Sequence, residues 1–245
     1  MIGTSSLQAG SQPAPSTNER IKEPSSMKKW FGIAAIVLVL ATACSWLDSI
    51  NHKFHIFDHN ELHALAQSSI KLHSGQANST RLVIDNIVTT LAEKYGTKHI
   101  NVNQKEWFFN NAGGAMGALY IIHASITEYL IIFGTPLGTE GHSGRHFADD
   151  YFSILEGEEW AFKAGSLEKE VYPVGSVHHM RRGEVKQYKI HEHCFALEYA
   201  AGWIPLMMPF GLADFFFSTL DIGTLKSTIQ ITGREMLRNL LVGKV

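Results

Sequence analysis

A single carboxylate, Glu198, interrupts an apolar run near the end of the chain, FALEYA (195–200). If this run is a β-strand, Glu198 shares one face with Ala196 and Ala200, whose small side chains leave room beside the carboxyl group. An ionised carboxylate is costly to bury without a partner, so a buried acid is hydrogen-bonded, protonated or used in chemistry. The run therefore allows two interpretations of Glu198: a solvent-facing strand residue or a proton-transfer group inside a pocket.

A second acid for such a pocket could come from Asp149 and Asp150 in HFADDYF. Neighbouring residues of a strand point to opposite faces, so at most one of these two faces the same interior as Glu198. Two carboxyl groups whose pKa values are set apart by burial can perform an acid and a base step in one pocket. The alternative is a polar pair in a turn or at a rim.

A metal site is the competing chemistry for Glu198. His191 and His193 precede it in the pattern H-x-H-x₄-E, part of the motif with which cupin barrels bind Mn, Fe, Ni or Zn, and His178 and His179 could add imidazoles. The glycines that flank that motif in metal-binding barrels are not at the expected offsets, and 13 histidines make chance spacings common. We therefore predict no metal and no other cofactor.

Other classes of function lose support from composition and from missing motifs. The chain contains no G-x-S-x-G, no phosphate-binding G-x-x-x-x-G-K-[ST] and no Rossmann glycine pattern. A formal net charge of -2, without a basic run, argues against a nucleic-acid partner. A hydrophobic content of 45% predicts a folded chain rather than a disordered one.

The N-terminal part predicts a tail and a membrane anchor. Residues 1–29 are rich in Ser, Gln, Pro and Gly and are expected to be disordered, and residues 30–50 contain an uncharged run, WFGIAAIVLVLATACSWL, long enough to span a bilayer. More basic residues precede this run than follow it, which places the tail in the cytosol and the main domain across the membrane. The alternative is a cleaved signal peptide, with a secreted barrel that begins at Cys44.

The segment 51–140 is predicted to be a helical region that packs on a barrel. Helical spacing and caps indicate helices that begin at Asp58 and at Ser79, the second ending at Gly96. The nearly uncharged stretch from Asn111 to Gly134 is predicted as a longer helix, with a second membrane span as the alternative.

The remaining two segments predict a β-domain and a helical C-terminus. Residues 141–202 contain short β-prone runs separated by Gly, typical of a small barrel or sandwich, with Glu198 on the last strand. Residues 203–245 contain two helix-like segments that are unusually rich in aromatic residues. They are expected either to lie in the membrane interface or to form a core-packed hairpin.

Two long stretches resemble the family of fungal C-8 sterol isomerases and sigma non-opioid receptors. They are EWFFNNAGGAMGALYIIHASITEYLIIFGTPLGTEGHSGRHFADDYFSILEG (106–157) and FALEYAAGWIPLMMPFGLADFFFSTLD (195–221). The resemblance extends from about Trp30 to Val245, and details such as FADDYF and FGLADFFFSTLD are more similar to the fungal enzyme branch.

The resemblance implies an α+β fold: a cupin-like β-barrel flanked by helices, one N-terminal transmembrane helix and C-terminal helices resting on the membrane. It also implies a protein of the endoplasmic reticulum membrane, with the main domain on the luminal side. Asn78 lies in a glycosylation sequon that would be accessible there. A homotrimer is implied because the receptor branch forms trimers.

The resemblance also assigns roles to individual residues. Glu198 matches the glutamate that pairs with the ligand's ammonium in the receptor branch, and Tyr129 matches a tyrosine that helps to orient that ligand. The receptor's second buried acid falls on Phe152 here, so Asp149 is the first choice and Asp150 the second choice of partner for Glu198. Other residues expected at the substrate are His123, Phe152, Tyr199 and His179.

The implied reaction moves a sterol double bond from delta-8 to delta-7 in ergosterol-type biosynthesis. A carboxylic acid protonates carbon 9, a cation forms at carbon 8, and loss of a proton from carbon 7 completes the shift; which acid donates stays open. Membrane lipid is an expected partner of the protein, and the same pocket is expected to accept amphiphilic amines that mimic the cation. The alternative function is a receptor or chaperone that binds sterols or amines without turnover.

Overall fold

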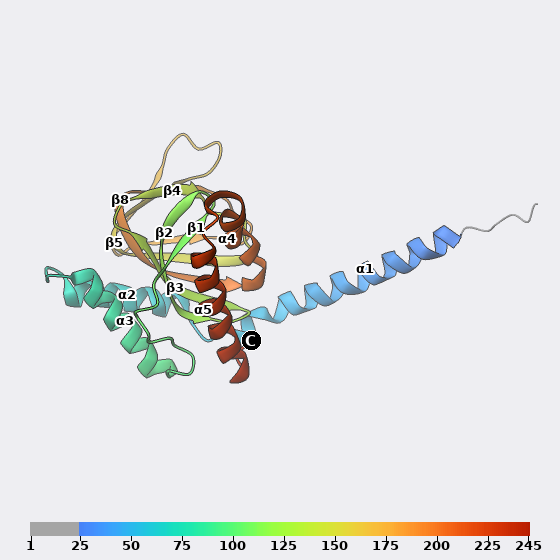
Figure 1. Ribbon diagram of the computed structural model, residues 1–245, viewed down its shortest axis with the longest axis horizontal. Helices are drawn as coiled ribbons and strands as arrows, with labels where there is room; N and C mark the ends of the chain where they lie inside the picture. Colours follow the sequence, from blue (N-terminus) through green and yellow to red (C-terminus); the bar gives the residue numbers. More distant parts are fainter. Residues whose placement is uncertain (1–24) are drawn as a thin grey trace, which may run out of the picture. The chain divides into compact units, whose positions relative to one another are not determined.

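The computed structural model describes residues 25–245, in two units that divide between Leu47 and Asp48 (Figure 1). Residues 1–24 of the predicted tail lie outside the described part of the chain. The first helix begins at Ser25, five residues before the predicted start of the anchor, and it therefore takes in the end of the expected tail. Met27, Lys28 and Lys29 have good helix propensity, which accounts for the earlier start.

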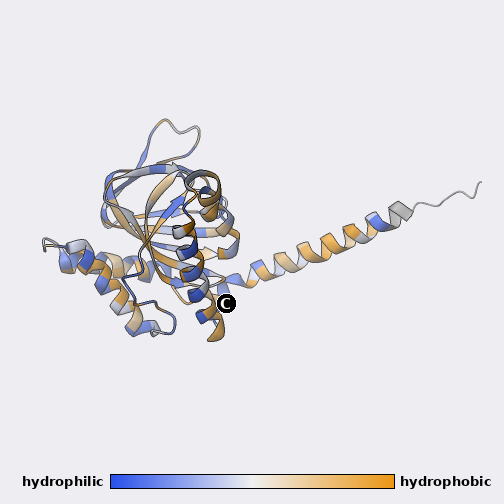
Figure 2. Ribbon diagram, viewed as in Figure 1, coloured by the Kyte–Doolittle hydropathy of each residue, from blue (hydrophilic) through white to orange (hydrophobic). Residues whose placement is uncertain are grey.

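The described part of the first unit is helix α1 (Ser25–Ile50), whose last three residues, after Leu47, are counted with the second unit. At 1.5 Å per residue its 26 residues extend roughly 39 Å, more than the roughly 30 Å of a hydrocarbon core. Its side chains from Trp30 to Leu47 are exposed and predominantly apolar (Figure 2). Within residues 25–245 it is the helix with the length and composition to cross a membrane.

The second unit begins with a helical pair that covers one side of a sheet. A short 3-10 turn (Asn51–Phe54) leads to α2 (His59–His73) and α3 (Ser79–Tyr95). The Asp58 side chain caps α2 by accepting hydrogen bonds from the backbone N–H groups of Asn60 and Glu61. Gly96, at φ +83°, ends α3, so both helices lie where the sequence predicts them.

Eight antiparallel strands form a single sheet that curls around an interior (Figure 1). The strand order is β1-β2-β3-β8-β5-β6, with β4 paired to β8 and β7 paired to β5. The strands are β1 (Phe108–Ala112), β2 (Ala115–Ala124), β3 (Glu128–Thr135), β4 (Thr139–His142), β5 (Ala148–Phe162), β6 (Glu170–Pro173), β7 (Val177–Met180) and β8 (Gln187–Gly202). Together with the helices they confirm the predicted α+β class.

The helix predicted from Asn111 to Gly134 is wrong, because this stretch forms the end of β1, β2 and most of β3. Gly113 and Gly114 adopt φ values of +63° and +85° in the turn between β1 and β2. The helical region therefore ends at Tyr95, and the sheet begins at Phe108 instead of residue 141. The alternative of a second membrane span disappears with this helix.

Burial on both faces explains the error. One face of β2 and β3 packs against α2 and α3, and the other faces the interior of the sheet. Tyr120 and Ile122 belong to the first cluster, whereas Leu119 and Ile121 belong to the second. A strand buried on both faces reads as a continuous apolar run, which periodicity alone does not distinguish from a buried helix.

The C-terminal part forms two helical segments, as predicted. A 3-10 turn (Ile204–Leu206) leads to α4 (Met208–Asp214), which a π-helical turn (Phe215–Thr219) continues, and α5 (Ile222–Leu241) follows. Helix α4 packs against β1, and α5 packs against β1 and β2. Asp221 caps α5 by accepting a hydrogen bond from the Thr224 N–H (3.0 Å).

Candidate active site

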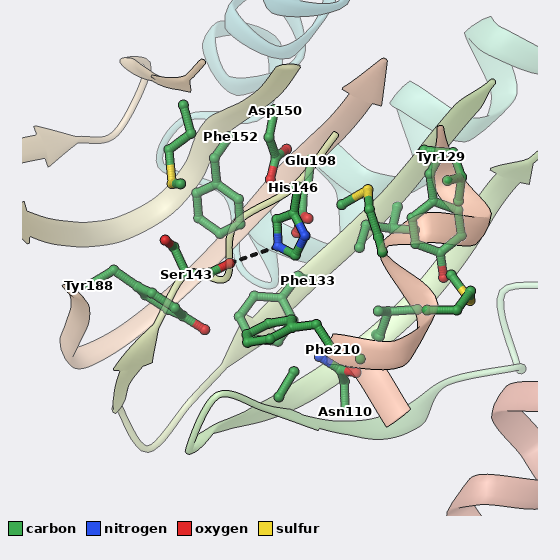
Figure 3. A pocket seen from close by; sticks show the side chains of 18 of the residues that line it. Asn110, Tyr129, Phe133, Ser143, His146, Asp150, Phe152, Tyr188, Glu198 and Phe210 are labelled. Atoms are coloured by element: carbon green, nitrogen blue, oxygen red, sulfur yellow. Dashed lines mark hydrogen bonds between the residues drawn. The ribbon is translucent and has the colours of Figure 1, made fainter. Parts of the chain in front are cut away.

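A cavity lies inside the curled sheet, between its strands and the C-terminal helices. Strands β3, β5 and β8 contribute one wall, and α4 and α5 contribute residues at the other side. Its surface is predominantly apolar, and aromatic side chains such as Phe133 and Phe152 are prominent in it (Figure 3). A concave apolar site with a few polar groups is typical of a small-molecule site.

Two of these polar groups, Glu198 and Asp150, are carboxyls that lie close together (Figure 3). In the pairing of β5 with β8, Phe152 lies opposite Glu198 and Asp150 lies opposite Ala200. Asp150 is thus two residues from the position across from Glu198, on the same face of the sheet. The two carboxyl groups are close enough for each to shift the pKa of the other.

Burial raises the pKa values of both acids above their ordinary range. For Glu198 the further causes are the negative charges of Asp150 and Glu159. The charge of Glu159 also raises the pKa of Asp150. Two ionised carboxylates in one apolar site repel each other, so the pair favours a state in which it holds a proton.

Asp149, the first choice as partner of Glu198, is corrected to Asp150. Its carboxylate accepts hydrogen bonds from His179 Nε2 (3.1 Å) and from the backbone N–H of Arg182 (3.3 Å), outside the cavity. The reason is the alternation of side chains along β5, which turns Asp149 away from the interior that Asp150 faces.

The other sequence-predicted site residues divide between the two faces of the sheet. Tyr129 and Phe152 line the cavity (Figure 3), as does Thr232 of α5. His123 packs edge-on against Phe57 on the helical side, and Tyr199 lies on the same side. His179 stacks on the Tyr151 ring, 4.3 Å between ring centroids. His123, Tyr199 and His179 do not line the cavity, because their strands turn these side chains outward.

The histidines of the H-x-H-x₄-E pattern are not brought to Glu198. His191 is exposed and stacks on Trp160, with ring centroids 5.0 Å apart, and His193 is exposed as well. Neither lines the cavity. The chemistry available there is thus that of paired carboxyl groups in an apolar, aromatic surrounding.

Sequence reasoning missed Glu159 as a cavity residue. Two bulges interrupt the pairing of β5 with β8, one between Ile154 and Glu156 and one between Gly157 and Glu159. The first adds one residue to β5 and shifts its alternation, so that the odd-numbered Glu159 faces the interior which the even-numbered Asp150 and Phe152 also face. The cluster GEE in the sequence contains the acid, but nothing in it predicts the bulges.

The raised pKa of Glu198 predicts a specific pH dependence of stability. Above the ordinary glutamate pKa the unfolded chain releases this proton and the folded chain keeps it, so the free energy of unfolding falls as pH rises. Glu198→Gln should make this decline shallower by about 1.4 kcal/mol per pH unit between about pH 5 and 7. Urea unfolding at a series of pH values measures the slope.

The matched control for this measurement is Glu140→Gln. Glu140 lies on β4 in an exposed ion pair with Lys189, and its removal should leave the slope unchanged. Equal slopes for wild type and Glu198→Gln would contradict the proton assignment.

Comparison with known proteins identifies relatives of two kinds, enzymes and receptors. A family model described as "ERG2 and Sigma1 receptor like protein" matches residues 34–244. The C-8 sterol isomerase erg2 of Aspergillus fumigatus is 58% identical over 216 residues, which cover 88% of this chain and 89% of that protein. The sigma non-opioid intracellular receptor 1 of Xenopus tropicalis is 34% identical, over 86% of this chain and 94% of that protein.

Among solved structures, an RmlC-like cupin from Shewanella frigidimarina aligns with a TM-score of 0.36 and 12% identity. The alignment covers 42% of this chain and 90% of that chain.

Proposed function

The chain belongs to the ERG2 and Sigma1 receptor-like family, and from this premise we propose that its buried acid pair moves the ring double bond of a sterol. It is a sterol isomerase, an enzyme that transposes a C=C bond within its substrate from delta-8 to delta-7. The observation that supports this chemistry in the present chain is the pair of buried carboxyl groups, Glu198 and Asp150, which line one apolar cavity and have raised pKa values.

Glu198 serves as the acid and Asp150 as the base in this proposal. An alkene is a very weak base, so the donor must be a carboxylic acid that its surroundings keep neutral. Glu198 holds the shared proton and delivers it to carbon 9, which leaves a cation at carbon 8. Asp150 then removes a proton from carbon 7, and the electron pair of that C–H bond becomes the new double bond.

The cavity also offers groups that stabilise the cation. The ionised Asp150 supplies a negative charge, and the rings of Phe133 and Phe152, whose centroids are 6.2 Å apart, supply their negatively polarised faces. The same features suit an amphiphilic amine whose ammonium group occupies the place of the cation. We expect such amines to inhibit by competition with the sterol.

The exposed apolar surfaces suit a protein that takes its substrate from a membrane. Helix α1 provides a span, and Phe216, Phe217 and Ile222 at the junction of α4 and α5 are exposed, Phe217 to 90%. We propose the endoplasmic reticulum membrane as the location, with the sheet on the luminal side as the charge asymmetry around α1 indicates. A homotrimer, as implied by the resemblance to the receptor branch, stays a prediction.

Expression in a yeast strain that lacks its sterol isomerase tests the function. We expect the accumulated delta-8 sterol to disappear and the delta-7 sterol to be restored, as measured by sterol profiling. A protein that binds sterols or amines without turnover would leave the accumulated delta-8 sterol in place. That result, together with normal expression in microsomes, would favour the receptor or chaperone function instead.

A further inference from the structure

Four polar side chains form a continuous chain from the cavity toward the surface. Glu159 Oε2 lies 3.0 Å from His178 Nδ1, and His178 Nε2 lies 3.0 Å from Lys186 Nζ. Lys186 Nζ in turn donates to Glu170 Oε2 at 2.5 Å. Glu159, His178 and Lys186 are each no more than 5% exposed, whereas the Glu170 side chain is 38% exposed.

The inner end of this chain faces the acid pair. Glu159 and His178 line the same cavity as Asp150 and Glu198. The negative charge of Glu159 is close enough to act on the pair, since it raises the pKa values of both carboxyl groups. The outer end opens into a separate polar depression, which is lined by Glu170, Tyr172, Lys186 and Glu184 among others.

The hydrogen bonds of this chain have a defined direction. A lysine ammonium has no lone pair, so Lys186 must donate and His178 Nε2 must accept. The remaining ring proton of a neutral His178 is then on Nδ1, from which it is donated to the Glu159 carboxylate. Both N–H bonds that link Lys186, His178 and Glu159 thus point toward the cavity.

The acid pair needs such a connection because each turnover moves its proton. After isomerisation Glu198 is ionised and Asp150 carries the proton taken from carbon 7. The proton can return directly from one carboxyl group of the pair to the other, in which case the hydrogen of one substrate is delivered to the next. It can also exchange with water, but the cavity wall around the pair is largely apolar.

We propose that Glu159, His178 and Lys186 form a proton relay that connects the acid pair with water at Glu170; this inference rests on the proposed isomerase function. Burying an acid, a histidine and a lysine in one hydrogen-bonded row is costly, so a purely structural role would be served as well by apolar side chains. The three residues are positioning residues in this proposal, because they act on the reaction only through the acid pair.

One inward passage carries one proton from water to the acid pair. A Lys186 N–H bond breaks as an N–H bond forms at His178 Nε2, the His178 Nδ1–H bond breaks, and an O–H bond forms on Glu159. Glu159 passes this proton to the acid pair, and a water at Glu170 protonates Lys186 and becomes hydroxide. The reverse sequence carries a proton outward, returns the ring proton of His178 to Nδ1 and neutralises the hydroxide, and no electrons are exchanged.

Isotope content of the product tests the relay. Microsomes that contain the full-length protein are equilibrated in D2O and given delta-8 sterol for many turnovers, and mass spectrometry measures deuterium at carbon 9 of the delta-7 product. We expect wild type to place deuterium on nearly every product molecule. In Glu159→Gln and in Lys186→Met, exchange should slow by roughly 100-fold, so that recycled protium predominates at carbon 9.

The readout separates a relay from a structural role. A variant that folds poorly makes less product, but the isotope ratio of the product it makes does not change for that reason. The matched control is Glu158→Gln, which removes the acid next to Glu159 on β5, where Glu158 only accepts from the Trp160 indole, and it should retain the wild-type ratio.

The possible results distinguish the relay from the reaction itself. Wild-type deuterium content in both relay variants would overturn the relay and show that water reaches the acid pair by another route. Protium at carbon 9 in wild type would also overturn it, while leaving the isomerase function intact. Absence of turnover in wild type would overturn the proposed function and the relay together.

Discussion

Glu198→Gln and Asp150→Asn are each expected to lower the isomerisation rate by roughly 1,000-fold or more, because each removes one of the two proton-transfer groups. The amide introduced by Glu198→Gln fills the same space as the carboxyl group but has no acidic proton for carbon 9. The amide introduced by Asp150→Asn lacks the basicity to take a proton from carbon 7. Rates of delta-7 sterol formation in microsomes, normalised to the amount of folded protein, measure both effects.

Asp149→Asn is the matched control for this prediction. Asp149 is the immediate neighbour of Asp150 on β5, but its carboxylate bonds to His179 outside the cavity. We expect this variant to keep its rate within about twofold of wild type, as surface substitutions cost little. Loss of activity in Asp149→Asn with retention in Asp150→Asn would contradict the placement of the two side chains.

The comparison of these two aspartates shows what the sequence could and could not predict about the site. Alternation along a strand establishes that only one of them faces Glu198, but it does not say which. The choice depends on the register of β5 against β8, in which Asp150 lies opposite Ala200. The register depends on contacts between segments about 50 residues apart, so it cannot be predicted from the spacing of residues within one segment.

The family and the isomerase activity predicted from the sequence are confirmed by the relatives, because long motifs carry them. The fold is predicted less completely. Periodicity predicts a helix where β2 and β3 lie because both faces of these strands are buried, one against α2 and α3 and the other in the interior. Glu159 escapes prediction because a bulge in β5, between Ile154 and Glu156, reverses the expected alternation.

The relay and the acid pair also depend on the stability of the sheet. Glu128 stabilises it by bonding to three parts of the second unit. This fully buried carboxylate, at the start of β3, accepts hydrogen bonds from the backbone N–H groups of Ile56 (2.8 Å) and Phe57 (3.0 Å). It also accepts the Tyr199 hydroxyl of β8 (2.6 Å) and pairs with Lys244 Nζ (2.9 Å). The segment before α2, the sheet and the C-terminus thus meet at one side chain.

Glu128→Ala is therefore expected to lower the free energy of unfolding by about 3–5 kcal/mol, because it leaves the buried Lys244 ammonium without its counter-ion and the two N–H groups without their acceptor. For a unit of this size that corresponds to a fall of roughly 10 °C or more in melting temperature. Thermal unfolding of the detergent-solubilised protein at pH 7 measures this fall in melting temperature.

The control is Glu140→Ala, which breaks the exposed pair with Lys189 and should cost less than about 1 kcal/mol. The partners of Glu128 cannot turn to water when it is removed, whereas the exposed partner of Glu140 can. Equal falls in melting temperature in the two variants would therefore show that Glu128 does not hold these segments together.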